Sequence, residues 1–437
     1  MIEGSRPSVL LSRLLRLGGA CLILTGVLGC GRQDDRAQVL DFWVMGREGE
    51  MVQPLVRDFE AQNPGIRVRV QQIPWTAAHE KLLTAHVGRA TPDLAQLGNT
   101  WVPEFQALDA LVAIGDRVAA SGDIDPRDHF PGIWDTNVLG GQLYGVPWYV
   151  DTRLLFYRTD LLAAAGFAEP PRNWAQWRRA LEALTARGPE NYGILLPINE
   201  WTQPVILGLQ AGSPLLKDGD THGDFAGPAF GRALDFYAGL FTDGLAPPMS
   251  NYEIANIYQE FERGTFAMII TGPWNIGEFR RRLPSDMQDR WTTAPMPAAE
   301  GDGPGVSLAG GSSLVVFESS PHQDEAWRLI EFLSRPEQQV RFFRLTGDLP
   351  AHRDAWSAPE LADDPEAKAF RDQLECVVPT PKIPEWEQIA TRIWERSEAV
   401  IRGAETPAEA MAGLDADVDR ILAKRRWLLE RKGDDGG

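Results

Sequence analysis

Short apolar segments alternate with amphipathic helical segments along most of this chain. Residues 39–44, 66–70 and 94–97 have the length and apolar pattern of strands. Residues 51–59 carry an apolar stripe at helical spacing, and residues 77–90 are expected to form a second helix. This alternation predicts an α/β fold built on mostly parallel, doubly wound sheets.

A further strand is expected at residues 266–270, where a short apolar run has no helical stripe. Thr271, Gly272 and Pro273 stop it, and Asn275 with Glu278 has the spacing of a reciprocal N-cap. Trp274 therefore follows the carboxyl end of a strand, where open α/β sheets hold their ligands. Its flat indole suits the apolar face of a sugar ring, although packing in the core is an equally good interpretation.

The N-terminus has the pattern of an export signal. Arginines precede the almost wholly apolar residues 17–29, which are too few to span a membrane. Val27-Leu28-Gly29-Cys30 resembles the lipobox of bacterial lipoproteins, in which the cysteine carries the lipid. The resemblance implies a signal peptide over residues 1–29, a tether over residues 30–37, and a periplasmic or cell-surface lipoprotein anchored to the membrane. The alternative interpretation is that Cys30 carries no lipid and is only a small buried residue near the signal.

Charge and motifs exclude several function classes. The formal net charge of −18 argues against nucleic acid as a partner. The six histidines show no metal-ligand spacing, and no nucleophile elbow, Walker loop or dinucleotide fingerprint is present. No cofactor, metal or catalytic residue is therefore expected.

Four segments, taken in order, resemble blocks of the bacterial extracellular solute-binding proteins of the maltose and trehalose type, which serve ATP-binding-cassette (ABC) sugar importers. They are LYGVPWYVDTRLLFYRTDLLAAAGF (143–167), FERGTFAMIITGPW (261–274), DEAWRLIEFLSRPEQQ (324–339) and TPAEAM (406–411). The resemblance implies a type II periplasmic-binding-protein fold, in which two α/β lobes are joined by a hinge with the ligand cleft between them. It also implies a monomer whose partners are a small carbohydrate and the importer's permease subunits.

The same resemblance gives the domain boundaries. Lobe one would comprise residues 38–150 and 308–350, lobe two would comprise residues 151–307 and 351–430, and residues 431–437 would be a disordered tail. Crossings between the lobes are expected near residues 148–154, 306–312 and 349–353. Gly310 and Gly311 suit the second crossing because glycine allows close backbone approach and absorbs rotation, although a β-bulge explains them equally well.

Candidate binding residues are polar and aromatic side chains in the loops that follow strands, together with the crossings. Sugar hydroxyls both donate and accept hydrogen bonds, and the faces of sugar rings are apolar. The candidates are Arg47, Glu48, Asn99, Trp101, Trp148, Tyr149, Asp151, Glu200, Trp201, Trp274, Gly310, Gly311 and Arg353. Five other tryptophans are assigned to the core or to ordinary surfaces: Trp75, Trp134, Trp177, Trp327 and Trp394. Trp43 could either reach the cleft or pack beneath it.

The expected function is capture of a disaccharide or short oligosaccharide, such as maltose or trehalose, by hinge closure. Two alternatives remain open. A receptor for a glycerophosphodiester or another phosphorylated solute could use Arg47 and Arg353, although the negative charge of the protein would repel such a ligand. A secreted two-carboxylate glycoside hydrolase could use Asp151 and Glu200.

Overall fold

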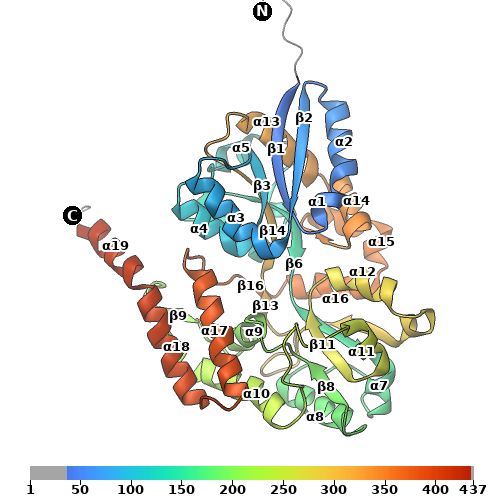
Figure 1. Ribbon diagram of the computed structural model, residues 1–437. Coiled ribbons are helices and arrows are strands. Elements are labelled where there is room, and N and C mark those ends of the chain that lie inside the picture. The colour runs from blue at the N-terminus through green and yellow to red at the C-terminus, as the bar shows by residue number, and fades with distance from the viewer. Residues whose placement is uncertain (1–36, 435–437) are drawn as a thin grey trace, which may run out of the picture. The chain divides into compact units, whose positions relative to one another are not determined.

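Two β-sheets organise the computed structural model, which describes residues 37–434 (Figure 1). The export signal, Cys30 and nearly all of the tether lie outside the described residues, so the anchor remains a prediction. No helix in the described part of the chain is long and apolar enough to cross a membrane.

The first sheet has six strands in the order β15-β6-β14-β3-β1-β2. They are β1 (Gln38–Met45), β2 (Ile66–Ile73), β3 (Leu94–Gly98), β6 (Val146–Asp151), β14 (Gly310–Val316) and β15 (Leu349–Pro350). β1 pairs in parallel with β2 and β3, whereas β14 is antiparallel to β3 and β6. The expectation of mostly parallel sheets is therefore wrong. The chain returns to this sheet from distant parts of the sequence as β14 and β15, which run opposite to the other four strands.

Helices cover both faces of the first sheet (Figure 1). They come from residues 48–135 and 323–346: α1 (Glu48–Met51), α2 (Gln53–Gln62), α3 (Trp75–Val87), η1 (Asn99–Trp101), α4 (Val102–Ala107), α5 (Gly115–Ala120), η2 (Pro126–Asp128), α6 (Pro131–Asp135), α13 (Gln323–Ser334) and α14 (Pro336–Thr346). In β14, Leu314 and Val316 join the core that contains α2 and α13, whereas Val315 joins the core that contains α3 and α4. Alternate side chains of one strand thus fill two cores.

The second sheet has four strands in the order β12-β7-β11-β8. They are β7 (Leu154–Arg158), β8 (Tyr192–Leu195), β11 (Phe266–Thr271) and β12 (Trp291–Ala294). Only β8 and β11 pair in parallel. The helices packed around this sheet or connected to it are α7 (Thr159–Ala164), α8 (Trp174–Thr185), α9 (Thr202–Gln210), α10 (Pro228–Thr242), α11 (Ile257–Arg263), α12 (Trp274–Arg282), η3 (Ser285–Arg290), η4 (Arg353–Ser357), α15 (Pro359–Ala362) and α16 (Pro365–Leu374).

Three short strand pairs complete the β structure: β4 (Val138–Leu139) with β5 (Gln142–Leu143), β9 (Leu216–Lys217) with β10 (His222–Gly223), and β13 (Ser307–Leu308) with β16 (Val377–Val378). The chain passes between the two large sheets three times. It does so between β6 and β7, between β12 and β14, and after β15. Residues that are distant in sequence therefore come together in the region between the two sheets.

The chain ends in three helices: α17 (Trp386–Ile401), α18 (Pro407–Ile421) and α19 (Ala423–Asp434). Thr406 and Glu409 form a reciprocal capping box that fixes the start of α18. Helix α19 continues to Asp434, past residue 431 where the sequence predicts a disordered tail. The Arg431 guanidinium lies 4.4 Å from the Trp427 ring one turn earlier, a contact that favours the helical form.

Candidate functional site

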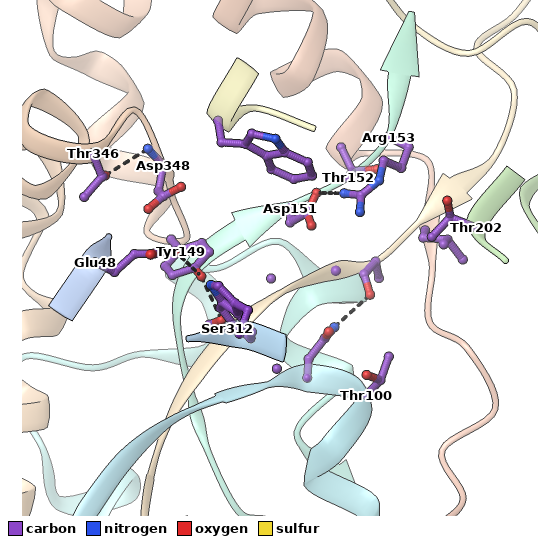
Figure 2. A pocket seen from close by; sticks show the side chains of 18 of the residues that line it. Glu48, Thr100, Tyr149, Asp151, Thr152, Arg153, Thr202, Ser312, Thr346 and Asp348 are labelled. Carbon is purple, nitrogen blue, oxygen red and sulfur yellow. Dashed lines mark hydrogen bonds and ion pairs between the residues drawn. The ribbon is translucent and has the colours of Figure 1, made fainter. Parts of the chain in front are cut away.

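A cavity of about 710 Å³ is lined by residues of the first sheet, by segments that join the two sheets, and by helices that accompany the second sheet (Figure 2). Ten of the predicted site residues line it: Arg47, Glu48, Asn99, Trp101, Tyr149, Asp151, Trp201, Trp274, Gly310 and Gly311. They come from the turn after β1, from η1 after β3, from β6, from the starts of α9 and α12, and from the start of β14.

Strand β6 explains why one of two adjacent aromatics reaches this cavity. Successive side chains of a strand point to opposite faces. Tyr149 and Asp151 share the face that lines the cavity. Trp148 points the other way, is 1% exposed and stacks on Phe342 with ring centroids 4.3 Å apart. The prediction that Trp148 binds ligand is therefore wrong, because its side chain belongs to the core.

Gly310 and Gly311 lie where β14 passes close to β6. A Cβ atom on Gly310 would come within 2.5 Å of the Asp151 carbonyl oxygen, and one on Gly311 would collide with the Tyr149 carbonyl. Gly311 also has a φ of +133°, which side chains rarely allow. The register of β14 against β6 shifts between Ser312 and Ser313, so a bulge follows directly. These glycines let the strands meet at the cavity wall.

Four tryptophans and a tyrosine give the cavity its flat apolar surfaces: Trp75, Trp101, Trp201, Trp274 and Tyr258. Trp75 packs edge-to-face on Trp101 with centroids 5.5 Å apart. Trp274 is 37% exposed, and the Arg153 guanidinium lies 4.6 Å from its ring. Trp274 therefore lies at the cavity and not in the core, with a cation already against its ring.

The assignment of Trp75 to the core or to an ordinary surface is wrong. Strand β2 runs on to Ile73, three residues beyond the predicted end, so Trp75 follows the carboxyl end of a strand as Trp101 does. The strand-end rule that selected Trp101 would have selected Trp75, had the polar residues Gln71 and Gln72 been included in the strand.

A buried hydrogen-bond network fixes the polar floor of the cavity (Figure 2). The Tyr149 hydroxyl donates to Glu48 Oε1 at 3.0 Å. Gln96 Nε2 donates to the Tyr149 hydroxyl at 2.8 Å, and Ser312 Oγ donates to it at 3.0 Å. The Met45 N–H in turn donates to Gln96 Oε1 at 2.8 Å. Glu48 is therefore held in place by bonds that begin in the backbone of β1.

Four of the five carboxyl groups that line the cavity have raised pKa values, whereas Arg282 and Arg281 hold the pKa of the fifth, Glu278, below its usual value in spite of partial burial. Burial raises the pKa of Asp151, and its ion pair with Arg153 only partly offsets this. Burial likewise raises the pKa of Glu48 and of Glu387, which accepts from the Thr100 hydroxyl at 2.6 Å. Burial and then the charge of Glu48 raise the pKa of Asp348 well above its usual range. The free protein thus buries acids whose charged forms lack sufficient donors.

Two predicted site residues, Glu200 and Arg353, do not line the cavity and contact other side chains instead. Glu200 accepts from Asn251 Nδ2 at 2.7 Å and does not line the cavity. Arg353 pairs with Glu375 at 2.6 Å, and its guanidinium lies 4.8 Å from the Phe130 ring. Sequence reasoning placed both residues beside the cleft, but it could not show these local contacts.

The predicted reciprocal N-cap of α12 is also wrong, although the helix does open directly behind the turn. The Asn275 amide donates to Thr271 Oγ1 at 2.6 Å and accepts from the Tyr258 hydroxyl at 2.8 Å. Glu278 pairs with Arg281 and Arg282 and lines the cavity. Asn275 and Glu278 therefore make polar contacts at and near the cavity and do not cap the helix.

Other lining residues carried no strong sequence signal. Arg153 and Thr152 follow β6, Tyr258 lies in α11, and Asp348 lies in the turn between α14 and β15. Only the fold brings these segments together. Residues 37–434 contain no cluster of three or more histidine, cysteine or acidic side chains that could hold a metal ion.

Comparisons with known proteins agree with this fold. A family model described as bacterial extracellular solute-binding protein matches residues 46–340. The solved structure of the sugar-binding protein MalE from Xanthomonas citri is 50% identical, with 90% of this chain and 99% of that chain covered and a TM-score of 0.86. The diacetylchitobiose binding protein DasA of Streptomyces coelicolor is 24% identical, with 95% and 99% covered. An uncharacterized lipoprotein of Streptomyces antibioticus is 29% identical, with 78% of each covered.

The matched family, the two-sheet architecture and the cavity between the sheets point to the same conclusion. The chain belongs to the bacterial extracellular solute-binding proteins, has the two-lobed type II α/β fold, and is a binding protein and not an enzyme.

Proposed function

We propose that this protein binds a short uncharged carbohydrate in the cavity and delivers it to the membrane permease of an ABC importer. A disaccharide such as maltose or trehalose is the preferred ligand. The observation that carries the proposal is the lining itself, in which four tryptophans stand beside buried carboxylates in a volume of about 710 Å³. This size is ordinary for a small-molecule pocket, whose volume is about 300–1,000 Å³.

The similar proteins support this ligand class. The Xanthomonas citri structure is a sugar-binding protein, and the Streptomyces coelicolor relative binds diacetylchitobiose. The aromatic rings offer more than one stacking surface, which suits a ligand of more than one sugar unit.

The charges in the cavity argue against a phosphorylated solute. Arg353, one of the two arginines on which that alternative depended, lies outside the cavity. Arg153 and Arg282 do line it, but they are paired with Asp151 and Glu278. Burying a phosphate beside acids that already lack donors would be costly. The hydrolase alternative is wrong, because the family consists of binding proteins and Glu200 lies outside the cavity.

The three passages of the chain between the sheets support capture by hinge closure. We propose that the lobes rotate at these passages, within the domain boundaries predicted from the sequence, and that sugar contacts from both lobes favour the closed form. Only contacts that improve on closure can drive this shift. Lipid attachment at Cys30 would keep the receptor near its permease, and one relative is itself called a lipoprotein.

The test of this proposal is a thermal-shift screen of maltose, trehalose, sucrose and longer glucosides, followed by calorimetric titration. A ligand at 100 times its Kd should stabilise the protein by about 2.7 kcal/mol. Trp274→Ala should weaken the binding of the best ligand by about 2 kcal/mol, or roughly 30-fold, because a flat cleft contact is lost.

Trp427→Ala is the matched control, since Trp427 is 50% exposed and does not line the cavity. It should leave the Kd unchanged. Wild-type affinity in the Trp274→Ala variant would remove Trp274 from the site. A screen in which no saccharide stabilises the protein would contradict the proposed function.

A further inference from the structure

Asp348 is the most buried acid at the cavity. It lies in the turn that ends α14, is 7% exposed and lines the cavity. Its backbone N–H donates to Thr346 Oγ1 at 3.0 Å, and the Thr346 hydroxyl donates its single hydrogen to the Phe342 carbonyl at 2.9 Å. Burial and the charge of Glu48 raise the pKa of Asp348, and they outweigh the effect of the Thr346 hydroxyl, which lowers it. Within residues 37–434 no side chain forms an ion pair with Asp348.

Glu48 is the acid next to it (Figure 2). Its charge is the largest effect after burial among those that raise the pKa of Asp348. The Tyr149 hydroxyl holds Glu48 Oε1, so the side chain cannot move away without breaking the network beneath it. Asp151 also raises the pKa of Asp348, whereas Arg47, which is exposed, lowers the pKa of both Glu48 and Asp348.

We propose that Glu48 and Asp348 form one subsite that accepts hydrogen bonds from two neighbouring hydroxyl groups of an uncharged sugar ring, and that this subsite excludes anionic sugars. The inference rests on the proposed function and adds the residues that select for an uncharged ligand. Two fixed carboxylates can accept two hydroxyl hydrogens at once, whereas a phosphate or a sugar acid would bring a further negative charge beside them.

The arrangement predicts opposite effects on stability and on binding. Two buried like charges oppose folding of the empty protein, and sugar hydroxyls supply the donors they lack. Neutralising one acid should therefore stabilise the empty protein and weaken sugar binding. A residue with a structural role would lose stability instead.

The experiment compares Asp348→Asn and Asp348→Ala with Asp417→Asn in otherwise wild-type protein. Asp417 is a buried acid paired with Arg396 and Arg420, far from the cavity lining. With trehalose and maltose as probes, both Asp348 variants should bind at least about 10-fold more weakly, since hydrogen bonds to charged groups are strong. Asp348→Asn should raise the melting temperature of the empty protein. Asp417→Asn should lower it and leave the Kd unchanged.

Selectivity supplies the second readout. Wild type should bind trehalose but not trehalose 6-phosphate, and the double variant Glu48→Gln/Asp348→Asn should reduce this difference by at least about 10-fold. Wild-type Kd values in the Asp348 variants, or a lower melting temperature for Asp348→Asn, would overturn the subsite while the proposed function stands. A wild type that binds the phosphorylated sugar more tightly than trehalose would also overturn it. If wild type binds no saccharide at all, the proposed function fails and the subsite fails with it.

Discussion

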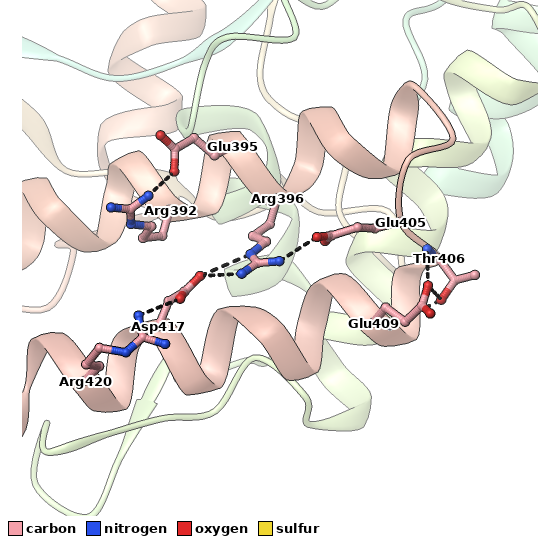
Figure 3. Close-up of polar contacts among 8 residues, drawn as sticks. All are labelled: Arg392, Glu395, Arg396, Glu405, Thr406, Glu409, Asp417 and Arg420. Carbon is pink, nitrogen blue, oxygen red and sulfur yellow. Dashed lines mark hydrogen bonds and ion pairs between the residues drawn. The ribbon is translucent and has the colours of Figure 1, made fainter.

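Asp417, between α17 and α18, and Asp348, at the cavity, are both buried, but their surroundings are opposite. Arg396 contacts Asp417 at 2.8 Å and Glu405 at 2.5 Å, and Arg420 contacts Asp417 at 3.0 Å (Figure 3). In spite of burial, these arginines hold the pKa of Asp417 below its usual range. In the cavity, burial prevails and the pKa values of Glu48, Asp151 and Asp348 are raised (Figure 2).

The difference separates acids that serve the fold from acids reserved for a ligand. Between the helices Asp417 finds its donors within the protein, so its charge adds to stability, whereas Glu405 bonds Arg396 through Oε1 and its Oε2 has no partner within residues 37–434. In the cavity the protein leaves acceptor positions unfilled, at some expense in stability, for donors that arrive with the ligand. Proteins commonly lose stability at functional sites in this way.

Removing the shared arginine should give the largest effect on stability. Arg396→Ala leaves Asp417 with Arg420 alone and Glu405 without its cation, so we expect a loss of about 2 kcal/mol in the free energy of unfolding. Sugar affinity should not change, because Arg396 does not line the cavity. Urea unfolding and calorimetric titration of the same variant measure the two quantities. An unchanged free energy of unfolding would mean that the ion pairs of Arg396 add nothing to stability. The contrast between these acids and the acids of the cavity would then fail.

The pH dependence of stability should have opposite signs in the two regions. The pKa of Asp417 is depressed from its ordinary value of 3.8, so its contribution to stability is present above that value and is lost as the pH falls through the folded-state pKa. The pKa of Asp348 is raised above 3.8, so its penalty is absent at low pH and grows as the pH rises from 3.8 through the folded-state pKa.

The measurement is urea unfolding of wild type, Asp417→Asn and Asp348→Asn between about pH 2.5 and 8, a range that extends below the ordinary carboxyl pKa of 3.8. The advantage of wild type over Asp417→Asn should shrink toward the acid end of this range. The advantage of Asp348→Asn over wild type should grow as the pH rises. Parallel curves for the two variants would show that the two acids do not differ as described.

The smallest effect is expected at Glu200. Its carboxylate accepts from Asn251 outside the cavity lining, so Glu200→Gln should leave the Kd for trehalose or maltose within about twofold of wild type. Glu48→Gln is the matched variant inside the cavity, where binding should weaken. A large loss of affinity in Glu200→Gln would mean that this loop moves onto the ligand when the lobes close.

The strand pattern, the family and part of the site could be predicted from sequence because they depend on local features. Periodicity located β1 and β3, and the position after a strand selected Trp101 and Trp274. Strict use of the same local rule would have found Trp75, and the alternation along β6 would have separated Tyr149 from Trp148.

The rest of the site depends on long-range contacts. Asp348 lies in a short turn whose sequence resembles many others, and only the pairing of β15 with β6 brings it beside Glu48. The sequence predicts that Arg353 binds ligand, but its guanidinium pairs with Glu375 and lies against the Phe130 ring. A sequence without an alignment gives no sign of such partners.

The most direct test of this account is a crystal structure of the protein with trehalose or maltose bound. We expect one sugar ring against Trp274, with two neighbouring hydroxyl groups within about 3 Å of the carboxylates of Glu48 and Asp348. A sugar bound outside this cavity, or bound inside it with both carboxylates still lacking donors, would contradict the claim that these acids are kept free for the ligand.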